Sequence, residues 1–284
     1  MMVFLKIIVY LSTIILMFTI VPTTFAVENP IDWSKGVIRV TGQGVGKSQY
    51  KSTSPGQYRL TGIQAARMDA QRQLVSYIEG IQVTAESSMA EFALKYDTVK
   101  TQTAGLIKNA VEIGEPKYNS ENDTWEVVME MKLYGGPKSV ASVAFIPLKD
   151  EPRISFPKPV NKNVITEPTV VNQNYTGLIV DCSGLGELNP VMSPVIKNTD
   201  GTKIYGHQNL DPDKIVVNGM ASYADSVDDP INQSRAGNKP LIIKAVSLSD
   251  LNATPVVSIE DADKILAANQ SDKFLDNCAV VFVK

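Results

Sequence analysis

A glycine-rich stretch, "TGQGVGKS" at residues 41–48, is the first place in this sequence that could do chemistry. The phosphate-binding loop of nucleotide hydrolases needs Gly-x4-Gly-Lys-[Ser/Thr], in which backbone N–H groups and the lysine surround the phosphates. Counting back from Gly46 puts Thr41 where the first glycine belongs, and the dinucleotide pattern Gly-x-Gly-x-x-Gly would need glycine at Lys47. Either loop must lead straight into a helix, whereas "SQYKSTSPGQ" follows here. We therefore predict a strand-to-helix connection and no nucleotide site.

Asp181 is the one position that favours an enzymatic interpretation. It closes the apolar run "LIVD" and precedes Ser183, Gly184 and Gly186, the place at which open sheets present ligand-binding residues. A carboxylate there could act as a general base, a nucleophile or a metal ligand. The alternative, which we favour, is that Asp181 caps its own loop by accepting backbone hydrogen bonds. No second acid stands at a spacing that fixes it to this candidate ligand loop.

Imidazole and thiol groups are scarce, because the chain has one histidine, His207, and two cysteines, Cys182 and Cys278. A zinc site needs three or four clustered ligands, and a histidine-dependent triad needs a nucleophile and an acid beside the ring. His207 lies in the polar stretch "IYGHQNLDP", which predicts a solvated loop histidine. The two cysteines border apolar runs and could form a disulfide in an exported chain, with two buried free thiols as the alternative. We predict no catalytic residue, no metal site and no cofactor.

The N-terminus predicts export. Residues 1–26 contain a single cation, Lys6, an apolar run, the helix-breaking Pro22 and "TFA", with small residues two apart. This pattern is typical of a signal peptide cleaved after Ala26. An uncleaved membrane anchor is the alternative, because the apolar run has about the 20 residues that a span requires.

The charge balance argues against nucleic acid as a partner. The chain has 27 basic and 30 acidic residues; removing residues 1–26 takes away Lys6, which leaves 26 against 30 and a net charge of −4. Without a cationic excess, neither nucleic acid nor an anionic membrane surface attracts the chain electrostatically. Membrane association would then come only through an uncleaved signal or through partners.

Residues 36–136 predict an α+β domain. "GVIRVTG" reads as a strand, and residues 57–79 as an amphipathic helix that Gly80 ends with a left-handed cap. A strand is expected from Ile81 and a second helix within residues 90–110. "VEIGEPKYN" and "TWEVVMEMKLYG" then flank the turn "SEND" as a hairpin with one buried face. The expected architecture is two helices packed on a mainly antiparallel sheet. The apolar stripe of the first helix consists of Leu60, Ile63, Ala66, Ala70, Leu74 and Ile78.

The run "GIQAARMDAQRQLVSYIEGIQVTAESSM" resembles the twenty-kilodalton outer-membrane lipoprotein family (Lpp-twenty), which includes the N-terminal domain of flagellar assembly protein T. The resemblance implies a non-catalytic cell-envelope protein that assembles with envelope or flagellar parts. The lipoproteins carry a lipidated cysteine after their signal and this chain has none, which favours a periplasmic location over outer-membrane anchoring. The matching positions are Ala66, Arg67, Ala70, Leu74, Ile78, Gly80, Ile81 and Val83.

A linker and a second module are expected to follow. Residues 149–174 contain four prolines and show no period, which predicts a semi-extended linker. Residues 175–284 contain continuous apolar strands, a hairpin around Asp200-Gly201 and a helix capped by Ser258, which predict an α/β or α+β module with a sheet covered on both faces.

Two functions from different classes are therefore open. We favour an exported, non-catalytic envelope protein that assembles with itself or with envelope or flagellar partners. The alternative is a periplasmic hydrolase or small-ligand binder centred on Asp181.

Overall fold

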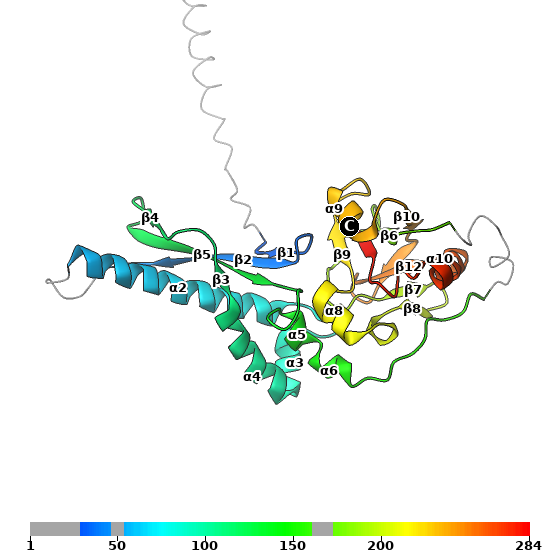
Figure 1. Ribbon diagram of the computed structural model, residues 1–284, viewed down its shortest axis with the longest axis horizontal. Helices are drawn as coiled ribbons and strands as arrows, with labels where there is room; N and C mark the ends of the chain where they lie inside the picture. The colour runs from blue at the N-terminus through cyan, green and yellow to red at the C-terminus, as the bar shows by residue number, and fades with distance from the viewer. Residues whose placement is uncertain (1–28, 47–53, 161–172) are drawn as a thin grey trace, which may run out of the picture.

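The computed structural model describes residues 29–46, 54–160 and 173–284, which form two α+β modules in contact (Figure 1). The predicted signal peptide, with its cleavage after Ala26, lies outside the described residues. So do Lys47 and Ser48 of the glycine-rich stretch and residues 161–172 of the predicted linker.

The first module is built on an antiparallel sheet of five strands, in the order β1-β2-β5-β3, with β4 also paired to β5. One face of this sheet is covered by the long helix α2 (Pro55–Gly80). Ser54 caps this helix in a reciprocal arrangement with Gln57. The strands are β1 (Ile31–Asp32), β2 (Val37–Gly44), β3 (Val111–Glu112), β4 (Lys117–Asn119) and β5 (Thr124–Lys132).

The glycines of the opening motif are packing residues. Gly42 and Gly44 lie on the face of β2 that packs against α2. A Cβ on Gly42 would lie 2.1 Å from the Ala66 carbonyl oxygen. A Cβ on Gly44 would lie 2.2 Å from the Gly62 carbonyl oxygen. Only glycine allows the strand and helix backbones to approach this closely. In the described part, the glycine-rich stretch thus belongs to a strand pressed against a helix.

The predicted hairpin is confirmed, with one refinement. Of the five residues that the alternation of the second strand places on the inward face, Trp125 is half-buried and the other four are buried: Val127, Met129, Met131 and Leu133. The first strand is divided into β3 and β4, because the chain turns at Gly114, whose φ is +74°.

Three local predictions for the first module were wrong. Gly80 is the last residue of α2 and the cap is Ile81 at φ −65°, so no left-handed cap forms. Leu60 is 68% exposed, because six residues of helix place it about 120° around the axis from Ala66. The region predicted as the second helix contains two helices, α3 (Met89–Lys95) and α4 (Asp97–Leu106), which are separated by the extended residue Tyr96.

The strand predicted from Ile81 does not form. Gln82 and Ser88 make one isolated bridge, and the chain between them turns back on itself. Its carbonyl groups are used by the second module instead: Met192 N–H donates to Gln82 O at 3.0 Å, and Ser193 N–H donates to Val83 O at 2.7 Å. The alternating pattern therefore marks a segment that pairs between modules.

The second module contains a parallel sheet in the order β10-β6-β13-β9. Helix α9 (Pro230–Ala236) covers one face, where Ile179, Val281 and Ala236 pack together. The opposite face carries Leu178 and Phe282 into the main core. Coverage of both faces confirms the expectation from the apolar strands. The strands are β6 (Gly177–Asp181), β9 (Ser222–Ala224), β10 (Pro240–Lys244) and β13 (Val280–Val283).

A second sheet of this module has the order β11-β12-β7-β8. Its strands are β7 (Ile196–Asn198), β8 (Lys203–Tyr205), β11 (Ser247–Ser249) and β12 (Thr254–Val257). The predicted hairpin is β7-β8, and the predicted helix is α10 (Ile259–Asp272), capped by Ser258. The run "KPLIIKAVSLS", expected as one strand, is divided between β10 and β11 in different sheets. Helix α8 (Pro212–Asn218) and a 3-10 turn, η2 (His207–Asn209), complete the module.

The two modules share one hydrophobic core and are joined by backbone hydrogen bonds. The N–H groups of Gly135 and Gly136 both donate to Val216 O, at 3.2 Å each. After α5 (Ala141–Ala144) and α6 (Ile146–Lys149), residues 150–160 of the predicted linker form neither helix nor strand. It lies against the second module, since Val160 N–H donates to the Asp263 carboxylate at 2.7 Å. The described part of the linker therefore attaches the modules to each other.

Candidate site in the cleft between the modules

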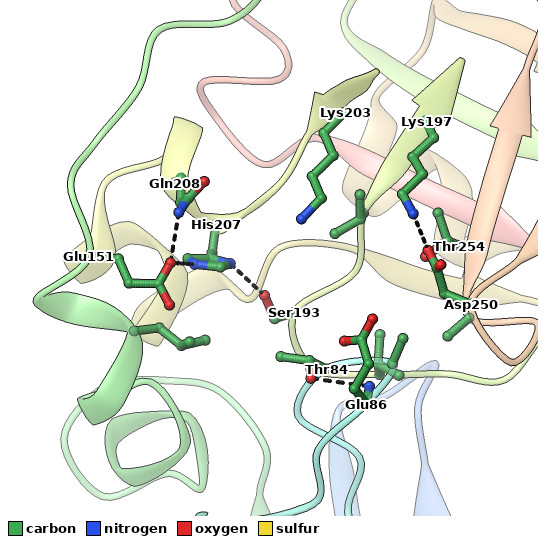
Figure 2. A pocket seen from close by; sticks show the side chains of 15 residues that line it. Thr84, Glu86, Glu151, Ser193, Lys197, Lys203, His207, Gln208, Asp250 and Thr254 are labelled. Atoms are coloured by element: carbon green, nitrogen blue, oxygen red, sulfur yellow. Dashed lines mark hydrogen bonds and ion pairs between the residues drawn. The ribbon is translucent and has the colours of Figure 1, made fainter. Parts of the chain in front are cut away.

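A polar cavity of about 230 Å³ lies where the two modules meet (Figure 2). The first module contributes the turn at residues 84–86, and the connection contributes Leu148 and Glu151. The second module contributes residues around β7, β8, η2 and β12. The turn reaches this position because of the backbone pairing between residues 82–83 and 192–193.

His207 lies in one wall of this cleft between a hydroxyl and a carboxylate. Its Nδ1 is 3.2 Å from Ser193 Oγ, and its Nε2 is 2.9 Å from Glu151 Oε2. Gln208 donates a further hydrogen bond to the same carboxylate oxygen at 2.7 Å. The prediction of a solvated loop histidine was wrong, because α6 ends just before Glu151 and brings this acid to η2, a pairing over 56 residues of sequence.

Serine, histidine and glutamate in a row are the groups of a nucleophilic triad, but this geometry does not support one. Ser193 is buried and only 3% exposed. Its N–H already donates to Val83 O and is not free to stabilise an oxyanion. The Ser193–His207–Glu151 chain connects the second module to the segment that joins the modules, and a joining role fits these contacts.

The charge of Glu151 is stabilised in the folded protein. Burial raises the pKa of this carboxyl, but hydrogen bonds from His207 and Gln208 outweigh that effect, so the pKa lies below its ordinary value. The ionised form is therefore the one that the fold favours.

The opposite wall contains an ion pair between Lys197 on β7 and Asp250, with Nζ and Oδ2 2.6 Å apart. The hydrogen bond from Lys197 is the main reason that the pKa of Asp250 lies below its ordinary value. Asp250 adopts a φ of +49° in the turn between β11 and β12, a conformation that aspartate tolerates better than most residues. This pair fixes the wall and neutralises both charges.

Glu86 and Lys203 are the free charges of the cleft. Both side chains point into it in Figure 2. Among the described residues, neither side chain forms an ion pair or a hydrogen bond with another residue, although the charge of Lys203 helps to lower the pKa of Glu151. The cleft thus offers one acceptor and one donor of opposite charge between two satisfied walls.

The sequence-predicted loop at Asp181 lies elsewhere. Asp181 accepts a hydrogen bond from Ser183 N–H at 2.9 Å, and Gly184 and Gly186 have φ values of +81° and +103°. Hydrogen bonding from Ser183 is the largest cause of the lowered pKa of Asp181. Asp181 therefore caps its own loop, as the favoured alternative predicted. None of these four residues lines the cleft of Figure 2.

Cys182 and Cys278 are free and buried, so the structure has two buried thiols and the disulfide considered from the sequence is not formed. Burial raises the pKa of the Cys182 thiol to about 12 and also raises the pKa of Cys278. Both thiols are thus kept in their protonated, unreactive form.

The described residues lack two kinds of feature. They contain no group of three or more histidine, cysteine or acidic side chains placed to hold a metal ion. They also contain no helix of the length and apolar character needed to cross a bilayer.

The cleft residues were missed because nothing in the sequence sets them apart. Glu86 fell in a predicted strand, Glu151 in a predicted linker and Lys203 in a predicted hairpin, while Ser193 belonged to no motif. The one available signal was His207 itself, because a single histidine in a long chain is worth tracing to its partners.

One known family matches part of the chain. The family described as Treponema pallidum Tp0624, second domain, matches residues 177–284, which is the second module. This description names no activity, so none is carried over to the chain. The curated proteins provide no match.

Proposed function

We propose that this protein is an exported, non-catalytic component of the cell envelope that acts by assembly with itself or with envelope or flagellar partners. The predicted signal peptide and the resemblance of residues 36–136 to the Lpp-twenty family support export and assembly. One observation supports a protein without catalytic activity. Ser193, His207 and Glu151 form a chain of contacts that ties the second module to the segment connecting the modules.

Helix α2 provides the surface that we assign to assembly. It extends away from the second module in Figure 1, with one face on the sheet. Its outward face carries Leu60 and Met68, which are 68% and 62% exposed. Positions eight residues apart differ by about 80° around the helix axis and by about 12 Å along it. Both apolar side chains therefore lie on the side of α2 away from the sheet, one turn before and one turn after Gln64.

Isolation of the tagged mature protein from its own envelope extract tests this function. We expect specific partners, or additional copies of the chain, to be recovered with the wild type. The double substitution Leu60→Glu with Met68→Glu should abolish recovery of these partners, because the new charges would have to be buried in the contact.

Leu251→Glu is the matched control, since Leu251 is 77% exposed on the second module. It should leave the recovered complex unchanged. Recovery of the same complex with the Leu60 and Met68 double variant would contradict the assigned surface, and a wild type that stays in the cytoplasmic fraction would contradict export.

A second function is favoured by a specific observation, namely the free charges Glu86 and Lys203 in the cleft. A small ligand with one cationic and one anionic group would satisfy both. This moves the small-ligand alternative from Asp181 to the cleft of Figure 2. Native mass spectrometry of the purified chain should then show a bound small molecule, which Glu86→Gln with Lys203→Gln would release and Asp181→Asn would not; equal retention by both variants would exclude the cleft.

A further inference from the structure

A second cavity, of about 300 Å³, lies between the modules near the end of β5. The turn between β1 and β2 contributes Trp33 and Ser34, β9 contributes Ser222, and α8 contributes its last residues. Three cationic side chains line it, Lys35, Lys132 and Arg235, and no aspartate or glutamate of the described residues does. In a chain whose net charge is −3, this concentration of positive charge is local and one-sided.

Arg235 carries a charge that no carboxylate of the described residues neutralises. Its two terminal nitrogens donate to backbone carbonyl oxygens, those of Asn218 and Gly219. The Nε of Arg235 is buried and has no hydrogen-bond partner in the described part of the chain. The carbonyls at the end of α8 hold the guanidinium in place and use one N–H of each terminal nitrogen. Each terminal nitrogen keeps a second N–H donor for a ligand, whereas the Nε is buried.

The two lysines differ in their pairing. Lys35 Nζ is 2.7 Å from Asp32 Oδ2, so its charge is compensated. Lys132 is exposed and forms no ion pair within the described residues. Of three positive charges, one is paired, which leaves two, on Lys132 and Arg235.

We propose that this cavity binds the phosphate group of a small molecule. A phosphate carries up to two negative charges and accepts several hydrogen bonds from different directions. Two uncompensated cations face it from different modules, and the hydroxyl of Ser222 adds a neutral donor. The hydroxyl of Ser34 already donates to the Asp32 carboxylate at 2.6 Å. A carboxylate carries one charge in one plane and would leave one of the cations unsatisfied. The ring of Trp33 lines the same cavity and offers a wall for an apolar part of the ligand.

Titration calorimetry of the full chain at neutral pH tests this proposal, with inorganic phosphate and glycerol phosphate as separate ligands and acetate as the comparison. We expect phosphate, its ester or both to bind and acetate to bind at least about tenfold more weakly. Binding of the ester alone would identify a phosphate monoester as the ligand, and equal binding of both would identify the phosphate group itself.

Lys132→Gln should weaken phosphate binding about tenfold, because it removes one of two uncompensated charges. Lys132→Arg keeps the positive charge and should bind phosphate about as well as the wild type does. Lys132 is exposed at the end of a strand, and circular dichroism should show the same fold in all variants. Lys108→Gln, at an exposed lysine outside the cavity, is the matched control and should bind as the wild type does. The proposal is overturned if neither phosphate ligand binds, if acetate binds equally, or if the Lys132 and Lys108 variants are affected alike.

Discussion

At the scale of single residues, Glu151 shows how a side chain from the connection stabilises the contact between modules. Glu151→Gln keeps the size of the side chain but removes the charge that accepts from His207 and Gln208. Because this side chain is 38% exposed, solvent screens the interaction. We expect a loss of about 1 kcal/mol in the free energy of unfolding at neutral pH, measured by urea denaturation.

The same residue predicts a pH dependence. The pKa of Glu151 is lower in the folded chain than its ordinary value. Its contribution is therefore complete above the unfolded-state pKa and is lost as the pH falls through the folded-state pKa. The stability difference between wild type and Glu151→Gln should shrink in acid, while Glu115→Gln, at an exposed acid, should match the wild type throughout. A difference that grows in acid would show that the neutral carboxyl is the favoured form.

The cysteines give a second prediction at this scale. Since Cys182 and Cys278 are buried thiols with raised pKa values, the folded chain should react with a thiol reagent much more slowly than free cysteine does. Denaturation without reductant should expose two reactive thiols. Finding none after denaturation would mean that the two sulfurs are bonded.

At the scale of elements, the approach of β2 to α2 predicts which glycines cannot change. Gly44→Ala would place a methyl group 2.2 Å from the Gly62 carbonyl oxygen, so strand and helix must separate. We expect about 3 kcal/mol or more of destabilisation, measured by thermal or urea unfolding. In α4, Gly105 has open space around its Cβ position, so Gly105→Ala should raise stability by about 0.5 to 1 kcal/mol. Equal effects of the two substitutions would contradict the close backbone packing.

The contrast between these elements shows what the sequence could predict. Steps of three and four residues from Ile63 to Ile78 identified the buried face of α2, because helix periodicity is local. The segment from Ile81 was misread, because its alternation is satisfied by backbone pairing with residues 192–193, a contact that no local pattern encodes. The same reason explains why the sequence did not predict the contact of Glu151 with His207 or the close approach of Gly42 and Gly44 to α2.

At the scale of the whole molecule, the two modules should unfold together. Their shared core, the backbone hydrogen bonds to Val216 and the contact of Trp33 with Tyr223, whose ring centres are 5.7 Å apart, couple them. We expect a single cooperative transition by calorimetry. Trp33→Ala should lower the midpoint of that transition without splitting it. Two separate transitions in the wild type would show that the modules are independent domains.

The proposed function depends most on a contact between α2 and a partner in the cell that makes the protein. A photo-crosslinking amino acid at position 68, with Leu251 as the control position, measures this contact directly. We expect a discrete, light-dependent adduct with an envelope or flagellar protein, or with a second copy, from position 68 but not from position 251. Monomer alone at both positions would contradict the assignment of this surface to assembly.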